Sequence, residues 1–268
     1  MNAIRPAAVA GMFYPADPAT LQHDVTTMLA QSAAADSPTL PKALIVPHAV
    51  YIYSGPVAAS AYARIAPWRE RIRRVVTFGP VHRVAVQGIA LPEAEAFATP
   101  LGTVPIDRAA AQVALGLPQV GLSVRCHEPE HSLEVQLPFL IRVLGEFSLL
   151  PFAVGYATPR EVAEVIELLW GGDETLIVIS ADLSHYHSYR DARELDRATA
   201  DSIFALDPGL DHEQACGATP IAGLLLRAAR HGLTPRLLDL RNSGDTAGPI
   251  VCRRVASTPE FRGIYCAP

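Results

Sequence analysis

The chain has 268 residues, of which 50% are apolar and 18% charged, with a formal net charge of −5. This composition supplies enough apolar residues for a large core and excludes an intrinsically disordered protein. The sequence has no basic stripe of the kind that binding to a phosphate backbone requires, so we expect no nucleic-acid partner.

The first residues and the cysteines indicate a cytoplasmic protein. Residues 1–10 lack the basic region and long apolar core of a secretory signal. No window reaches the roughly 18 unbroken apolar residues of a membrane span, so we expect no membrane partner. The four cysteines contain no C-x-x-C pair, and we expect them to be reduced thiols.

Length alone allows one domain or two packed halves; we expect a single α/β domain over residues 1–268.

The expected elements alternate along the chain between helical patterns and short apolar runs. Asp17 followed by Pro18 predicts the cap and first residue of a helix through Leu29. Thr158 and Thr219, each before a proline, predict two more helix caps. Further helices are expected at 57–65, 107–115, 133–143, 159–169, 189–206 and 220–231. Strands are expected at 43–46, 74–78, 147–154, 175–180 and 235–240.

The expected strands are apolar along nearly their whole length. Strands of this kind are typical of a sheet that is covered on both faces. Their alternation with helices predicts an α/β fold with a mainly parallel, mixed central sheet flanked by helices.

Histidines follow three of these strands within a few residues. His48 follows the first strand, His82 the second, and His185 the strand that ends at Ser180. If the three strands are parallel neighbours, the histidines project into one crevice beyond their carboxyl ends. Neutral imidazole is a common ligand of iron, copper and zinc, so convergence would make a metal site. Asp182 could orient one of these imidazoles. A single histidine at such a place is, however, more often an ordinary polar residue.

A second polar cluster covers residues 126–134. Pro129 argues against one helix through it, so His127 and His131 are not a dependable i,i+4 metal pair. Ser132 is expected to cap the helix that starts at residue 133, with Glu130 and His131 at the N-terminal end of that helix. The cluster is then either a capped turn or a part of the crevice rim.

Cys216 precedes Gly217 and the helix expected from Pro220. A thiol beside a helix N-terminus experiences a positive potential that favours thiolate, and therefore metal binding or redox chemistry. The alternative is a small buried residue without chemistry, which is the commoner role of a free cysteine.

The sequence resembles the Memo family, known in bacteria and archaea as AmmeMemoRadiSam system protein B. The matching stretches run in family order over nearly the whole chain. They are Ala-Gly-Met-Phe-Tyr-Pro (10–15), Pro-His-Ala-Val-Tyr-Ile-Tyr-Ser-Gly (47–55), Gly-Pro-Val-His (79–82), His-Glu-Pro-Glu-His-Ser-Leu-Glu-Val-Gln-Leu-Pro-Phe (127–139), Ser-Ala-Asp-Leu-Ser-His-Tyr (180–186), Cys-Gly (216–217) and Ser-Gly-Asp (243–245).

The resemblance implies a fold similar to the catalytic subunit of class III extradiol dioxygenases. In those enzymes two histidines and a carboxylate hold Fe(II), and a further histidine acts as acid/base. Carried onto this chain, His48 and His82 become metal ligands and Cys216 takes the carboxylate's place. His185 takes the acid/base position, with Asp182 beside it.

Two stretches depart from the family pattern. Val50 stands where the family has glycine, which could alter the loop or narrow the pocket. Residues 251–256 replace the family's Val-Gly-Tyr-Ala stretch, which puts the last strand in doubt.

These observations support one main function and two alternatives. The first is a non-haem redox enzyme of the dioxygenase type, with metal ligands His48, His82 and Cys216 and catalytic groups His185, Asp182 and His131. Fe(II) is the expected metal, with copper or zinc as alternatives, and the substrate is a small molecule. The second is a binding or adaptor protein that holds a protein segment or a companion protein of the same pathway. The third is a zinc hydrolase.

Overall fold

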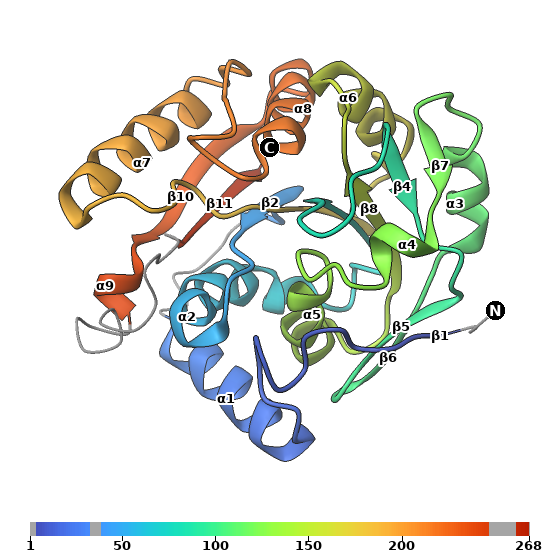
Figure 1. The fold of residues 1–268 in the computed structure, drawn as a ribbon, viewed down its shortest axis with the longest axis horizontal. Helices are drawn as coiled ribbons and strands as arrows, with labels where there is room; N and C mark the ends of the chain where they lie inside the picture. Colours follow the sequence, from blue (N-terminus) through green and yellow to red (C-terminus); the bar gives the residue numbers. More distant parts are fainter. Residues whose placement is uncertain (1–3, 33–38, 247–260, 268) are drawn as a thin grey trace.

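The computed structural model describes residues 4–32, 39–246 and 261–267, and of the last stretch only the strand backbone. An eight-stranded mixed sheet runs through the molecule, with strand order β10-β11-β2-β9-β3-β8-β4-β7 (Figure 1). These strands are, in chain order, β2 (Ala43–Val46), β3 (Arg74–Pro80), β4 (Ile89–Leu91), β7 (Val120–Leu122), β8 (Ser148–Val154), β9 (Thr175–Ser180), β10 (Thr234–Arg241) and β11 (Phe261–Ala267).

A second, three-stranded sheet lies near the N-terminus. It consists of β1 (Ile4–Arg5), β5 (Ala96–Thr99) and β6 (Gly102–Pro105), in the order β1-β5-β6. The helices are α1 (Pro18–Gln31), α2 (Tyr51–Tyr62), α3 (Arg108–Ala114), α4 (Val124–His127), α5 (Leu137–Leu144), α6 (Pro159–Leu168), α7 (Tyr189–Phe204), α8 (Ala218–Arg230) and α9 (Ser243–Thr246), with 3₁₀ turns η1 (Ala63–Trp68) and η2 (Glu134–Gln136).

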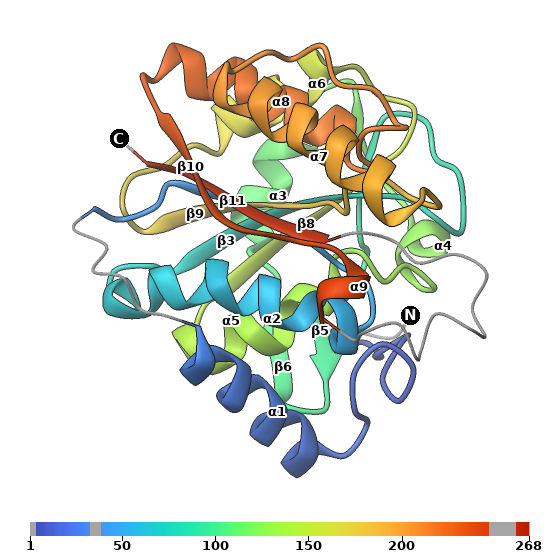
Figure 2. The same cartoon turned by 90° about the vertical axis from the view of Figure 1, so that its left-hand side faces the viewer.

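Helices cover both faces of the large sheet, as the sequence predicted. Figure 2 shows the sheet between α6, α7 and α8 on one side and α1, α2 and α5 on the other. Two apolar clusters fill the spaces, one beneath each helical layer. Every residue of β2 and β9 is buried, which explains their unbroken apolar sequences. The α/β fold class is therefore confirmed.

The sheet places the carboxyl ends of three central strands together. β2 pairs in parallel with β9, and β9 pairs in parallel with β3. β3 also pairs in parallel with β8, whereas β4 and β11 run antiparallel to their neighbours β8 and β2. The segments after β2, β3 and β9 therefore leave the sheet at one edge, which is where ligands bind in open α/β sheets.

Three local predictions about helix starts were wrong. The helix expected from residue 57 begins at Tyr51 and runs through Pro56. Ser132 does not cap a helix, because its hydroxyl donates to the Pro80 carbonyl oxygen, and α5 begins only at Leu137. Thr219 lies inside α8, whose cap is Gly217.

The Thr158 prediction is confirmed, since its side chain and Glu161 form a reciprocal capping box. Asp17 likewise caps α1 by accepting from the Thr20 amide. None of the helices in the described part of the chain combines the length and apolarity that crossing a membrane needs. Residues 251–256, where the sequence departs from the family pattern, lie outside the described residues.

Candidate metal centre

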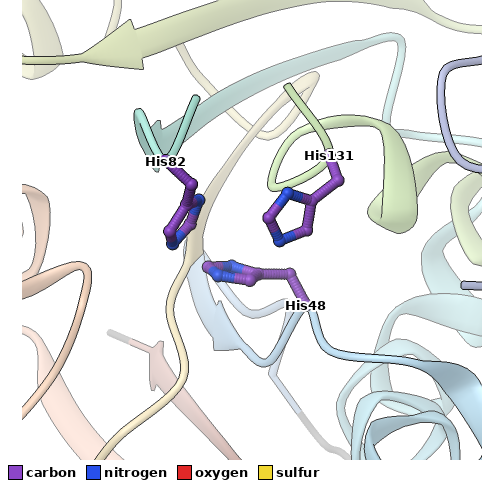
Figure 3. A group of neighbouring side chains, drawn as sticks. All are labelled: His48, His82 and His131. Carbon is purple, nitrogen blue, oxygen red and sulfur yellow. The ribbon is translucent and has the colours of Figure 1, made fainter. Parts of the chain in front are cut away.

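Three imidazoles meet at the carboxyl edge of the central strands. His48 follows β2, His82 follows β3, and His131 comes from the loop between α4 and η2. One ring nitrogen of each lies within 4.8 Å of the other two. The ring centroids are 5.1 Å apart for His48 and His82 and 4.7 Å apart for His82 and His131. Figure 3 shows the three rings gathered around one point.

A buried carboxylate, Glu130, holds two of these histidines. Its Oε1 atom lies 3.0 Å from Nδ1 of His82, and its Oε2 atom accepts the His82 backbone N–H at 2.6 Å. Oε1 also accepts the backbone N–H groups of His131 and Ser132. Because an ionised carboxylate only accepts hydrogen bonds, Nδ1 of His82 carries a proton, which leaves Nε2 as the nitrogen available to a metal.

The tautomer of His48 follows from the hydrogen bonds of Ser180. The Ser180 hydroxyl donates its one proton to the Ser132 carbonyl oxygen at 2.6 Å and accepts from Nε2 of Gln136 at 2.8 Å. Nδ1 of His48, 2.8 Å from the same hydroxyl oxygen, must therefore be the donor. His48 thus presents an unprotonated Nε2 to the centre.

The third imidazole, His131, is held differently. Its Nδ1 is buried and has no hydrogen-bond partner among the described residues. The nearest carboxylate oxygen, Oε1 of Glu130, is 3.2 Å away but outside hydrogen-bonding geometry. Instead, the ring of Phe13 packs against the His131 ring with centroids 4.5 Å apart.

Burial keeps His48 and His131 neutral. It lowers the pKa of His48 well below the usual value, and positive charge on the neighbouring histidines would lower it further. Burial also lowers the pKa of His131 to about 4, against the opposing charge of Glu130. Burial acts to raise the pKa of Glu130, but its hydrogen bonds and charge interaction with His82 lower it to about 2. At neutral pH His48 and His131 are therefore uncharged, and the Glu130 carboxylate beside them is ionised.

Cys216 adjoins this cluster at Nε2 of His48. Its Sγ atom lies 3.4 Å from Nε2 of His48 and accepts the backbone N–H of Asp182 at 3.3 Å. The expectation that the helix terminus makes it a thiolate was wrong for the metal-free protein. Burial, together with the negative charge of Asp182, raises the pKa of the Cys216 thiol well above its usual value.

Asp182 contacts His48 rather than His185. Its Oδ1 atom accepts the His48 backbone N–H at 2.8 Å, and Oδ2 is 3.7 Å from His48 Nε2. Burial raises the pKa of this carboxyl group to about 7. The carboxyl group of Asp182, which lines the cavity, therefore titrates near pH 7.

The centre opens into a cavity of about 900 Å³. The metal-site candidates His48, His82, His131 and Cys216 line it, together with Asp182 and His185. Burial lowers the pKa of His185, so this imidazole is neutral at pH 7. Apolar and aromatic side chains form the remaining wall, including Phe13, Ile52, Tyr53 and Tyr186. Val50 lines the same cavity with a φ of −56°, a conformation that does not require glycine.

The structure brings together all six residues that the sequence singled out. His48 and His82 lie side by side, and Cys216, Asp182 and His185 line the same cavity. The sequence allowed His131 to lie either in a capped turn or on the crevice rim, and the structure places it in the imidazole cluster. From the sequence, Glu130 was identified only as a residue at the N-terminus of the helix expected from residue 133. Its two contacts to His82 had no sequence signal, because the two residues belong to different segments.

The residues present fit a transition-metal ion. Neutral imidazoles with free lone pairs are preferred donors for iron, copper and zinc, and a thiol is available beside them. A carboxylate that hydrogen-bonds to the other nitrogen of a ligating histidine is the usual support in such sites. His131 adds a buried ring nitrogen to the same cluster, since its Nδ1 atom has no hydrogen-bond partner among the residues described.

The fold and the site define an α/β protein with a candidate three-histidine metal centre beyond the carboxyl ends of parallel strands. The chain belongs to the Memo-like protein family, whose model matches residues 5–253. Similar relatives are MEMO1 family proteins of Aquifex aeolicus at 35% identity and Sulfolobus acidocaldarius at 33%, each match covering 91% of this chain and 94% of the relative.

A relative from Methanosarcina acetivorans, also a MEMO1 family protein, is 34% identical over the same shares of the two chains. Among solved structures, an uncharacterized protein from Escherichia coli K12 matches with a TM-score of 0.50 at 14% identity. That match covers 83% of this chain and 98% of the other, and it supports a shared fold.

Proposed function

We propose that the protein is a metal-dependent redox enzyme of the non-haem iron type, acting on a small molecule in the cavity above the histidine cluster. The observation that carries this proposal is the convergence of His48, His82 and His131 within 4.8 Å, with the other nitrogens of His48 and His82 already hydrogen-bonded. Sites of imidazole donors with open positions suit iron chemistry with oxygen.

The separations between donor atoms support Cys216 as a further ligand. Metal–nitrogen and metal–sulfur distances of about 2.1 and 2.3 Å at a tetrahedral angle place the two donors about 3.6 Å apart. The observed distance between Nε2 of His48 and Sγ of Cys216 is 3.4 Å. We therefore propose His48, His82 and Cys216 as ligands, as the family resemblance implies, with His131 as a fourth donor.

One ring nitrogen of each of His48, His82 and His131 lies within 4.8 Å of the other two. Two nitrogens bound at about 2.1 Å can be at most about 4.2 Å apart, so any pair farther apart than this would have to approach on loading. A bound metal would supply Lewis acidity and one-electron chemistry to a substrate in the cavity.

His185 and Asp182 have the properties needed for proton transfer beside that ion. His185 is a neutral imidazole on the cavity wall, so it can accept a proton from a substrate hydroxyl. Asp182, with its pKa near 7, can hold a proton released when the thiol or the substrate binds. The apolar and aromatic side chains on the cavity wall favour a substrate with an apolar or aromatic body.

The test begins with protein purified without oxygen. Bound metal is measured for the wild type and for the His48→Ala and Cys216→Ser variants, with circular dichroism as the check on folding. We expect the wild type to bind one Fe(II) per chain and both folded variants to bind it at least tenfold more weakly. Unchanged metal content in both variants would remove the proposed ligand set.

Oxygen uptake separates the proposed reaction class from its alternatives. The Fe(II)-loaded protein is supplied with candidate catechols, and oxygen consumption is followed with an electrode. Consumption that depends on both metal and His185 supports the redox enzyme. Hydrolysis of ester substrates with zinc but no oxygen uptake would indicate a zinc hydrolase, and a metal-loaded protein inert in both assays would indicate a binding protein.

A further inference from the structure

The N-terminal segment of residues 5–14 wraps around the loop that carries His131. Arg5 lies in β1 and is almost fully buried, an unusual place for a guanidinium group. Its Nε atom donates to the carbonyl oxygen of His127 at 2.7 Å and its Nη2 atom donates to that of Glu130 at 2.5 Å. Arg5 therefore fixes the backbone on the N-terminal side of His131.

Glu134 connects Arg5 to the rest of this segment. It forms a buried ion pair with Nη1 of Arg5 at 2.5 Å. The same carboxylate accepts the backbone N–H groups of Ala8 at 2.7 Å and Val9 at 3.1 Å and the hydroxyl of Tyr14. Because the side-chain partners of Glu134 in the described part of the chain lie within residues 5–14, its carboxylate ties that segment to the turn that follows His131.

Phe13 is the part of the segment that reaches the centre. Its backbone carbonyl accepts the Tyr51 N–H at 2.8 Å, which fixes the residue at the start of α2. Its half-buried ring lies on the cavity wall, against the ring of His131 at a centroid distance of 4.5 Å. Within the described residues Nδ1 of His131 has no hydrogen bond, whereas Nδ1 of His48 and Nδ1 of His82 each have one, so the contact with the Phe13 ring is a support of a different kind.

We infer that Phe13 is a positioning residue that sets the ring of His131 for the metal, and that Arg5 and Glu134 hold the segment that carries Phe13. This inference rests on the proposed metal site. Its consequence is that residues far from the ligands in sequence control how strongly the third imidazole binds. A loose N-terminal segment would leave a centre of His48, His82 and Cys216 without His131.

The test uses the full-length, metal-free protein and Co(II) as the probe, read by its visible absorption bands. Phe13→Ala is expected to weaken Co(II) binding about tenfold or more and to change the intensity of the bands, because one donor is lost or displaced. Phe13→Leu keeps an apolar contact and is expected to restore most of the affinity. Phe13 is half-buried and packs against the apolar cluster on the α1, α2 and α5 side of the sheet, so circular dichroism checks that each variant is folded.

A double-mutant cycle separates positioning from a general effect on stability. If Phe13 acts through His131, Phe13→Ala makes no further difference to Co(II) affinity in a His131→Ala background. Full additivity of the two losses, or a Phe13→Ala affinity within twofold of the wild type, overturns the inference. A wild type that binds no Co(II) instead removes the proposed function.

Arg5 is tested with a matched control at another ion pair. Arg5→Met combined with Glu134→Gln removes both buried charges together, which avoids leaving one unpaired. We expect this pair of changes to weaken Co(II) binding at least tenfold. Arg74→Met combined with Asp107→Asn removes both charges of the partly buried Arg74–Asp107 pair, at the end of β3 opposite to His82, and should leave affinity within threefold. Equal losses in the two proteins would show a stability effect and contradict the role of Arg5.

Discussion

Glu130 binds both the backbone N–H and the Nδ1–H of His82, at 2.6 and 3.0 Å. A single carboxylate thus fixes where this imidazole stands and which of its nitrogens faces the metal site. Its negative charge also remains next to the cluster, since its pKa is about 2. These contacts make Glu130 the main support of the candidate centre.

Replacing Glu130 by Gln is expected to lower metal affinity by about 10- to 100-fold. The amide keeps the shape of the side chain but removes the negative charge that favours the Nδ1–H tautomer and the bound cation. Competition with a chromophoric chelator measures the change for Zn(II) or Co(II). Glu128→Gln is the matched control, because Glu128 is exposed and lies two residues away. Equal affinities in the two variants would contradict the role given to Glu130.

The stability of the metal-free protein should fall as the pH drops from about 6.5 to 4, with His127 as one cause. Burial lowers the pKa of His127 to about 4, whereas in the unfolded chain it titrates near its ordinary value. Between these two pKa values His127 is protonated in the unfolded chain but not in the folded protein, so the free energy of unfolding rises with pH. The contribution of His127 is fully present above its ordinary pKa. The contribution of this one group is about 3 kcal/mol.

Urea denaturation at pH 7 and pH 4.5, with chelator present, checks this expectation. His127→Gln keeps a donor for the Ala90 carbonyl oxygen, which Nε2 of His127 contacts at 2.9 Å. The variant should lose less stability than the wild type on acidification. An identical pH dependence in the two proteins would show that other groups account for the loss.

Metal addition should stabilise the folded protein through the same centre. At a free metal concentration 100 times Kd, a ligand that binds only the folded state stabilises it by about 2.7 kcal/mol. Differential scanning fluorimetry with Zn(II) should show a higher Tm that chelator reverses. His48→Ala should remove the rise relative to its own metal-free baseline. A rise of equal size in His48→Ala would place the bound metal elsewhere.

The strands that position the site could be predicted because their own sequences specify them. β2 and β9 are buried on both faces, so each reads as an unbroken apolar run, and their bounds matched the prediction. That β9 lies between β2 and β3 could not be read from any one segment, because strand order depends on contacts far apart in the chain. The short strands β4 and β7, of three residues each, carry too little pattern to be recognised.

The site was predicted less completely than the fold. His48 and His82 follow strands, which is a visible signal, whereas His131 lies in a loop whose position depends on Arg5 and Glu134. The ionisation of Cys216 was misjudged because the sequence shows the nearby helix terminus but not the burial that outweighs it. Partners such as Ser180 and Gln136, which set the His48 tautomer, are ordinary residues in sequence.

The close approach of Gly217 to β9 gives a final prediction about Cys216. A Cβ atom on Gly217 would lie 2.5 Å from Cβ of Ala181 and 3.1 Å from the backbone oxygen of Ser180. Gly217→Ala must therefore push the start of α8 away from the strand end, at a cost of about 1–3 kcal/mol. Since Cys216 is the preceding residue, its sulfur should move away from His48.

Two measurements on Gly217→Ala test this displacement together. Chemical denaturation should show the lower stability, and Co(II) loading should show a weaker sulfur-to-metal charge-transfer band than in the wild type. Gly121→Ala is the control, because a Cβ there meets no atom within 4 Å. A Gly217→Ala protein with lower stability but an unchanged charge-transfer band would mean that the sulfur keeps its place, and the link between this helix start and the metal centre would be wrong.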